Sequence, residues 1–347
     1  MTGSCWSALE LRSRPGLRTW LYKKLRGTGR LPHTAVSSPS LSRRRLAALA
    51  GLATLPGAAL MSPLNDVVAA SLLQSLQPSP RMPVLFVGHG SPMNAIEDNA
   101  WRRTWQDLGA ELLARQQRPQ LILCISAHWL TQGGWYLTGM AQPRTIHDFG
   151  GFPRELFEQQ YPAPGAPAVA ATLAQSLQSP ATGKPLGVDA DEWGLDHGTW
   201  SVLKPMFPQA QIPVLQLSMD YSRAPAEHLA LGRQLRALRE RGVLIVGSGN
   251  VVHNLREVRR GTGINAAYDW AHAFDAKVND QVKNGRLDTL AQFQQWGPEA
   301  RMAHPTHEHY LPLLYAAGAV HADQEMPRFF NTGFQLASIS MRSMLWG

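Results

Sequence analysis

The sequence predicts a single α/β domain with a central sheet, mostly parallel or mixed, and helices on both of its faces. Two observations support this class. Short runs of apolar, β-branched residues alternate with longer segments in which apolar residues recur every three or four positions. The first pattern is typical of buried strands and the second of helices. Residues 82–347 contain no internal repeat and no low-complexity linker, which favours one domain over several.

The expected elements alternate regularly along this region. A first strand is expected within PVLFVGHG, ending in a glycine-containing turn. Residues 99–117 predict a helix, because Trp101, Trp105, Leu108 and Leu112 recur at spacings of three and four. The further expected strands are residues 121–129, 183–189, 212–220, 242–250 and 334–345, and the further expected helices are residues 166–177, 197–206, 224–241, 266–284 and 306–317.

The first 60 residues have a different composition from the rest of the chain. They contain ten Arg or Lys residues and one acid, Glu10, whereas the remainder carries 23 basic and 24 acidic residues. The net charge of +8 therefore belongs to this segment, and no nucleic-acid partner is expected for the domain. The only cysteines, Cys5 and Cys124, predict neither a disulfide framework nor a cysteine-based zinc site.

Residues 1–60 are expected to form a disordered or signal-like extension. Ser42 and three arginines precede an apolar stretch, and this order resembles a twin-arginine export signal. The stretch is too short, and too often interrupted by Gly and Pro, for a membrane span, which needs about 20 apolar residues. We expect a cytoplasmic location and no membrane partner. Export to the periplasm through a twin-arginine signal in residues 42–60 is the alternative.

Four histidines lie in separate motifs that resemble strand ends or tight turns. They are His89 in VLFVGHGSP, His128 in LILCISAHWL, His253 in VLIVGSGNVVHNL and His309 in PTHEHYLPLLY. An open α/β sheet gathers its site at the carboxyl ends of its strands, so side chains from distant motifs can meet there. Neutral imidazole is the commonest metal ligand and suits zinc, iron or copper. The motifs therefore predict one metal site, although each histidine alone could equally be a turn or core residue.

Two further histidines lie among aromatic residues. His197 is flanked by Trp193 and Trp200 in WGLDHGTW, an environment suited to a general acid or base beside a planar apolar substrate. A loop histidine packed by tryptophans is the alternative. His147 and Asp148 in TIHDFGGFP form a polar pair that lines a pocket or caps a turn.

The segment around His309 excludes one familiar zinc motif. HEHYL is not H-E-x-x-H, so the helix-borne arrangement of zinc peptidases is absent from it. On a helix, His307 and His309 would point roughly 200° apart. We therefore expect only one of these two histidines to enter a common site.

Seven motifs occur in a fixed order between residue 82 and about residue 346: GHGSPMNAIEDN, SAHW, TIHDFGGFP, WGLDHGTWSVL, QLSMD, GSGNVVHNLR and PTHEHYLPLLYAAGA. Together they resemble the 4,5-DOPA extradiol dioxygenase family of the class III extradiol ring-cleaving superfamily. The resemblance implies a class III extradiol dioxygenase-like catalytic domain over residues 80–347. It also implies a central mixed or mostly parallel sheet and one divalent metal ion per subunit.

The resemblance assigns the metal ligands to His89, His128, His253 and His309, since the frame PT-x-EHYLP selects His309 rather than His307. Class III enzymes typically hold Fe(II) with two histidines and a glutamate, and His309 stands where that glutamate is expected. The resemblance therefore leaves the ion open between Zn²⁺ and Fe²⁺. Four imidazoles would close a tetrahedral zinc site, whereas catechol cleavage needs open positions on the metal.

The expected function is metal-dependent extradiol cleavage of a catechol such as DOPA with O₂. His197, or His253 if it is not a ligand, would carry a proton. A zinc-dependent hydrolase on the same scaffold, with His197 as proton shuttle, and a non-catalytic metal-binding protein are the alternatives. The oligomeric state is not predicted. Four residues are expected to contact the substrate: Trp129, His147, Trp200 and Tyr310.

Overall fold

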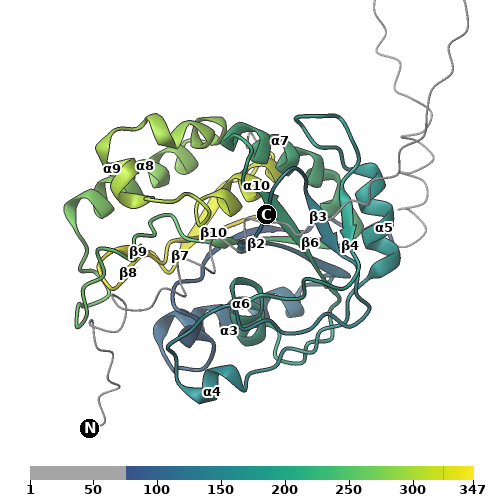
Figure 1. Ribbon diagram of the computed structural model, residues 1–347, viewed down its shortest axis with the longest axis horizontal. Helices are drawn as coiled ribbons and strands as arrows, with labels where there is room; N and C mark the ends of the chain where they lie inside the picture. Colours follow the sequence, from purple (N-terminus) through teal and green to yellow (C-terminus); the bar gives the residue numbers. More distant parts are fainter. Residues whose placement is uncertain (1–75, 323) are drawn as a thin grey trace, which may run out of the picture. The chain divides into compact units, whose positions relative to one another are not determined.

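An eight-stranded mixed sheet forms the centre of the computed structural model, which describes residues 76–322 and 324–347 (Figure 1). Its strand order is β4-β3-β5-β2-β6-β1-β10-β7. The predicted extension and its twin-arginine signal lie outside the described residues. The strands are β1 Val84–Gly88, β2 Leu121–Thr131, β3 Tyr136–Thr138, β4 Gly187–Asp189, β5 Val214–Asp220, β6 Val243–Gly249, β7 Pro327–Phe330 and β10 Ser343–Trp346, and a separate pair is formed by β8 Phe334–Gln335 and β9 Ile339–Ser340.

Helices cover both faces of this sheet, as the alternating pattern predicts (Figure 1). One layer contains α3 and α6, and the opposite layer contains α5, α7, α8 and α10. The helices are α3 Ala100–Ala114, α4 Arg154–Phe157, α5 Pro167–Ser176, α6 His197–Met206, α7 Pro225–Leu235, α8 Asp269–Lys283, α9 Pro298–Ala303 and α10 Leu311–Ala319, with 3₁₀ turns η1 Pro92–Ala95, η2 Arg236–Arg241 and η3 Leu287–Gln295.

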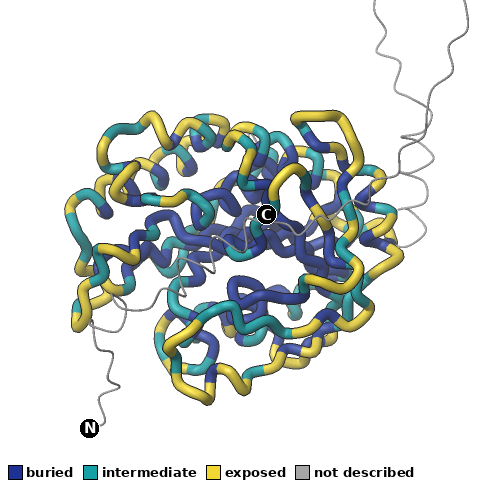
Figure 2. The backbone as a smooth tube through the Cα atoms, in the orientation of Figure 1, coloured by how far each residue is buried: buried dark blue, intermediate teal, exposed yellow. Residues whose placement is uncertain are grey.

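The strands β5, β2, β6 and β1 are mutually parallel and form the middle of the sheet. Every residue of β1, β5 and β6 is buried, which explains the apolar runs VLFV in β1 and VLIV in β6. The polar residues of β5, Gln216, Ser218 and Asp220, are also buried and are hydrogen-bonded. Successive side chains of β1 alternate between the layers: Val84 and Phe86 pack in one core, and Leu85 and Val87 in the other. Figure 2 shows this buried centre surrounded by exposed loops and outer helix faces.

The predicted class is confirmed, but one predicted element is wrong. Residues 334–345 form three short strands, because Leu336 and Ala337 adopt positive φ angles of 54° and 62° and turn the chain. The helix expected from residue 306 begins at Leu311, after a turn. No helix among residues 76–322 and 324–347 is long and apolar enough to cross a membrane.

Candidate active site

The central parallel strands bring three of the predicted histidines to one edge of the sheet. His89 directly follows β1, and His128 lies near the carboxyl end of β2. His253 comes four residues after the end of β6. Because β2, β6 and β1 are neighbours in the sheet, these histidines approach one another from distant parts of the sequence.

The fourth histidine, His309, reaches the same edge from the turn before α10. Its carbonyl oxygen accepts a hydrogen bond of 2.8 Å from the Asn250 backbone, which directly follows β6. A side chain at Gly249 would collide with that carbonyl, so the glycine permits this close approach. The sequence Gly-Ser-Gly-Asn at the end of β6 therefore positions His309.

The rings of His89, His128 and His309 form a nearly equilateral triangle. Their centres are 5.2 Å apart for His89 and His128, 5.2 Å for His89 and His309, and 5.0 Å for His128 and His309. Three imidazoles on one tetrahedral ion, with metal–nitrogen bonds of about 2.05 Å, would have ring centres roughly 5.2 Å apart. The spacing of these three rings fits a single divalent ion.

Hydrogen bonds to Ser248 determine which nitrogen of His89 is free. The Ser248 hydroxyl donates to the Gly198 carbonyl at 2.5 Å and lies 2.9 Å from His89 Nδ1. Since the hydroxyl hydrogen is used, Ser248 Oγ accepts from His89 Nδ1–H. The lone pair of His89 is then on Nε2, which faces His128 Nε2 at 3.4 Å.

A single carboxylate, that of Asp148, lies between His128 and His197. Its Oδ1 accepts from the His197 backbone N–H at 3.0 Å and from His197 Nδ1 at 2.9 Å. Its Oδ2 lies 3.3 Å from His128 Nδ1, within ion-pair distance though not in hydrogen-bond geometry, and its negative charge favours a proton on that nitrogen. In the same way, His309 Nδ1 lies 3.1 Å from the carboxylate of Glu308. Each of these imidazoles thus has an acceptor at Nδ1 and a lone pair on Nε2.

The lone pairs on Nε2 provide a second test of the site. The Nε2 atoms of His89 and His128 lie 3.4 Å apart, so either a proton carried by one of them or a shared cation prevents repulsion between two lone pairs. Two nitrogens of a tetrahedral zinc site are about 3.3 Å apart, from bonds of about 2.05 Å. The donor set therefore fits a divalent metal ion.

His253 lies beside this triangle in a different orientation. Its ring stacks on that of His309, with centres 3.5 Å apart and an interplanar angle of 7°. A metal ion binds close to the plane of each imidazole ligand, and two parallel planes do not meet at one ion. In this arrangement the two ring planes do not converge on one ion, although ligand atoms of His253, Glu308 and His309 lie within 4.8 Å of one another. The backbone of His253 is fixed by a hydrogen bond to the Ala303 carbonyl at 3.0 Å.

His197 is the first residue of α6 and is 7% exposed. Its ring centre lies 3.8 Å from that of His128 and 5.9 Å from that of His89, so it does not share the even spacing of the triangle. Candidate ligand atoms of His89, His128 and His197 nevertheless lie within 4.8 Å of one another. Phe149 contacts the His197 ring edge-on at 5.4 Å.

Burial favours the neutral form of His89 and His253. It lowers the pKa of His89 well below the ordinary value, and possible positive charges on His309, His197 and His253 lower it further. Burial and the same repulsion lower the pKa of His253. Neutral imidazole is the form that binds metal, so this environment suits ligands.

The four residues predicted to contact substrate lie around the cluster. Trp200 and Tyr310 are fully buried, and their polar atoms bond to the carbonyls of Ile146 and Leu290 at 2.9 and 3.3 Å. Trp129 stacks on Trp193 with ring centres 5.8 Å apart. His147 Nε2 donates to the Gln159 carbonyl at 2.9 Å. The structure thus places these residues in the surrounding packing, and their substrate contacts stay a prediction.

Sequence reasoning missed the residues that orient the imidazoles. The sequence pairs Asp148 with His147, and the structure brings Asp148 rather than His147 to the cluster. Ser248 carried no signal, because Gly-Ser-Gly matched no catalytic motif. Glu308 lies next to a predicted ligand, and that adjacency was the only available signal.

His307 and a surface pocket lie apart from the triangle. The ring of His307 stacks on Tyr221 with centres 4.5 Å apart.

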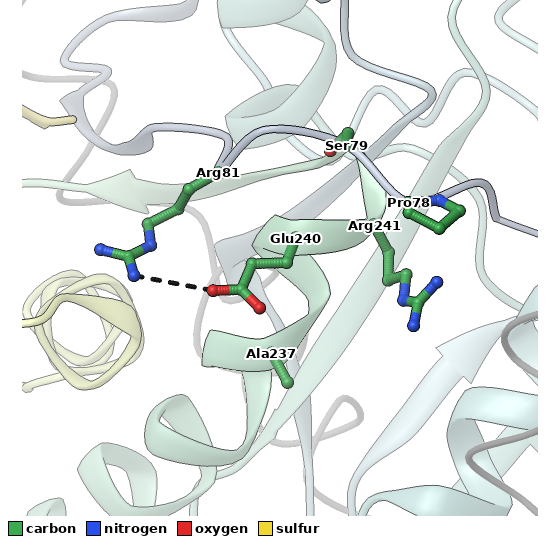
Figure 3. A pocket seen from close by; sticks show the side chains of 6 residues that line it. All are labelled: Pro78, Ser79, Arg81, Ala237, Glu240 and Arg241. Carbon is green, nitrogen blue, oxygen red and sulfur yellow. Dashed lines mark ion pairs between the residues drawn. The ribbon is translucent and has the colours of Figure 1, made fainter.

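A surface pocket of about 600 Å³ is crossed by an ion pair between Arg81 and Glu240 at 3.6 Å (Figure 3). None of the pocket's lining residues belongs to the histidine cluster, so the candidate site is defined by the side chains at the sheet edge.

The family comparison places this fold and histidine cluster among the aromatic ring-opening dioxygenases. Residues 83–340 match the family described as the catalytic LigB subunit of aromatic ring-opening dioxygenase. The chain belongs to this family and, within it, to the 4,5-DOPA extradiol dioxygenases, as the seven ordered motifs predict.

The relatives match two thirds or more of this chain. The chain is 45% identical over 271 residues to 4,5-DOPA dioxygenase extradiol of Escherichia coli K12, covering 78% of this chain and 96% of the relative. It is 36% identical to 4,5-DOPA dioxygenase extradiol of Beta vulgaris, covering 67% and 85%. The crystal structure of an uncharacterized protein of Escherichia coli K12 is similar at a TM-score of 0.65 and 41% identity, covering 77% of this chain and 100% of that chain.

Proposed function

We propose that this protein is a metal-dependent extradiol dioxygenase that opens the ring of a catechol such as DOPA with O₂. The observation that carries the metal requirement is the triangle of His89, His128 and His309, whose ring spacing fits one divalent ion. The catechol class is supported by relatives named 4,5-DOPA dioxygenase extradiol.

We assign the metal ligands to His89, His128 and His309. His253 is then not a ligand but a proton carrier, which is one of the two roles that the sequence leaves open for it. Three imidazoles on one side of an ion leave positions for the substrate oxygens and O₂, as in other oxygenase sites with three protein ligands. Both Zn²⁺ and Fe²⁺ accept imidazole, but zinc has no redox chemistry. We therefore propose Fe²⁺ as the active ion. When bound, it supplies the Lewis acidity that favours an ionised catechol hydroxyl and the redox chemistry that O₂ requires.

The protein's own residues handle the protons. His197 donates Nδ1–H to Asp148, so its Nε2 is free to accept the second catechol proton and later to return it. The half-buried His253 ring stacks on His309, which places it to accept a proton from the other side of the site. Phe149, packed edge-on against His197, would shield this proton from bulk water. Cleavage beside the diol would yield a muconic semialdehyde.

The test is anaerobic loading of metal-free protein with Fe²⁺, followed by O₂ uptake on a panel of catechols. We expect stoichiometric O₂ consumption and yellow ring-cleavage products, with Zn²⁺-loaded protein inactive. Absence of O₂ uptake with every catechol, together with ester or amide hydrolysis by the Zn²⁺ form, would replace this function with the hydrolase. Absence of both activities at full metal occupancy would leave a metal-binding protein.

We further propose that residues 80–347 form the catalytic domain and that the protein acts in the cytoplasm. The family match over residues 83–340 supports the domain bounds. Fractionation of cells that express the full chain tests the location. Periplasmic protein that returns to the cytoplasm when Arg43 and Arg44 are replaced by Lys would instead establish the twin-arginine signal.

A further inference from the structure

Asp148 contacts two histidines to which the proposed function gives different roles. It receives two N–H groups of His197 on one oxygen and faces Nδ1 of His128 with the other. The side chain is 3% exposed, so water does not compete effectively for these contacts. One buried carboxylate thus serves both a proposed ligand and a proposed proton carrier.

The position of Asp148 is fixed through the segment before it. The Ile146 backbone donates to the Leu195 carbonyl at 2.7 Å, and Leu195 donates to the Arg144 carbonyl at 2.9 Å. These bonds tie the loop of residues 144–148 to the residues that lead into α6. The distance between Asp148 and His197 is therefore set by backbone pairing.

We propose that Asp148 is a positioning residue that selects the tautomers of His128 and His197 together, holding both protons on Nδ1. An ionised carboxylate only accepts hydrogen bonds, so both imidazoles keep Nδ1–H toward it and Nε2 lone pairs toward the site. The inference rests on the proposed metal role of His128. It adds that a residue outside the ligand set determines whether His128 can bind.

The substitution Asp148→Asn tests this selection because its orientation is forced. The His197 backbone N–H is a donor in every tautomer, so it must face the amide oxygen of Asn. The amide NH₂ group then faces His128 Nδ1 and stabilises the lone pair there. His128 would move its proton to Nε2, which removes the lone pair needed by the metal.

Asp148→Ala is the matched comparison. It removes the same negative charge as Asp148→Asn, but it places no hydrogen-bond donor beside His128 Nδ1. We expect Zn²⁺ affinity, measured by competition with a chromophoric chelator, to fall about tenfold in Ala and roughly a hundredfold in Asn. A merely structural role predicts the reverse order, because Ala deletes more atoms than the isosteric Asn. Asp98→Asn, at a surface carboxylate paired with Arg103, controls for net charge and is expected to leave affinity unchanged.

Two-bond ¹H–¹⁵N correlation spectra of histidine-labelled, metal-free protein give an independent readout. We expect His128 to carry its proton on Nδ1 in wild type and on Nε2 in Asp148→Asn, while His197 keeps Nδ1–H in both. Wild-type protein that binds no Zn²⁺ but has these tautomers would overturn the proposed metal function and would support only the selection of the tautomers by Asp148. Unchanged His128 tautomer in the Asn variant, or weaker Zn²⁺ binding by Ala than by Asn, would overturn the inference alone.

Discussion

The imidazole of His253 lies parallel to that of His309, with ring centres 3.5 Å apart. Because of this stacking, the two neighbouring histidines are suited to different roles, one to metal binding and the other to proton transfer. The lone pair of each ring lies in its own plane, so an ion in the plane of His309 is above the face of His253. One ring can bind the metal while the other remains available for a proton.

Replacing each of these residues with Ala is expected to separate the two roles. His309→Ala removes a proposed ligand, so Zn²⁺ affinity should fall by more than the roughly 100-fold cost of losing an outer-shell partner. His253→Ala should keep its metal but lose roughly 10²–10⁴-fold in turnover. Chelator competition and O₂ uptake measure the two effects. His307→Ala is the control, because His307 stacks on Tyr221. Equal metal loss in both variants would make His253 a ligand.

Removing the Ser248 hydroxyl is expected to destabilise the metal-free protein. Ser248→Ala leaves His89 Nδ1–H and the Gly198 carbonyl without their partner, which costs about 1–3 kcal/mol of unfolding free energy. Ser201→Ala is the matched control, because the buried Ser201 hydroxyl has no hydrogen-bond partner among the described residues. Urea denaturation compares the two, and equal losses would show that the Ser248 bonds contribute nothing specific.

Metal removal is expected to lower stability by mass action. At free Zn²⁺ about 100 times its dissociation constant, binding to the folded state alone adds about 2.7 kcal/mol to the unfolding free energy. A chelator should reverse this gain in wild type. Denaturation of His309→Ala should show no Zn²⁺-dependent shift. A similar shift in that variant would place the stabilising ion elsewhere.

Acid is expected to destabilise the fold through His228, a buried histidine outside the candidate site. Burial lowers its pKa to about 4, and the Tyr315 hydroxyl lies 2.7 Å from its Nδ1. That hydroxyl also accepts from Trp135 Nε1 at 2.7 Å, so its hydrogen is directed to the neutral imidazole. The unfolded state therefore takes up a proton near pH 6.5, whereas the folded state takes it up only near pH 4.

This difference in proton uptake sets the direction in which the unfolding free energy changes with pH. Below pH 6.5 the unfolded state binds more protons, so stability falls as pH decreases, by up to about 1.4 kcal/mol per pH unit from this residue. His228→Gln, which does not titrate, should reduce the slope of unfolding free energy between pH 4 and pH 6.5. Urea denaturation across that range measures it. An unchanged slope would mean that His228 titrates equally in both states.

Much of the fold was predictable because three of the central strands begin with apolar runs. These runs, in β1, β2 and β6, need both faces covered, and that requirement indicates a layered α/β domain. The break at Leu336 and Ala337 could not be predicted, because neither residue type favours positive φ. Their conformation is imposed by tertiary contacts.

The candidate site was predictable in its residue types but not in its geometry. The motifs indicate which histidines reach the sheet edge, yet ring orientation decides which of them can share an ion. That orientation depends on partners distant in sequence, such as Ser248 for His89 and Asp148 for His128. No pattern within a single motif contains this information.

The position of β1 in the sheet has a consequence for biosynthesis. β1 lies between β6 and β10, and β10 is the last of the described strands in the sequence. Both neighbours of β1 are therefore synthesised long after it. During translation, β1 and the histidine that follows it remain an unpaired apolar segment until β6 and then β10 leave the ribosome. Such non-local pairing is slow and exposes strand edges to aggregation. The nascent chain is therefore expected to depend on chaperones, and the proposed metal site can form only after synthesis has passed His309.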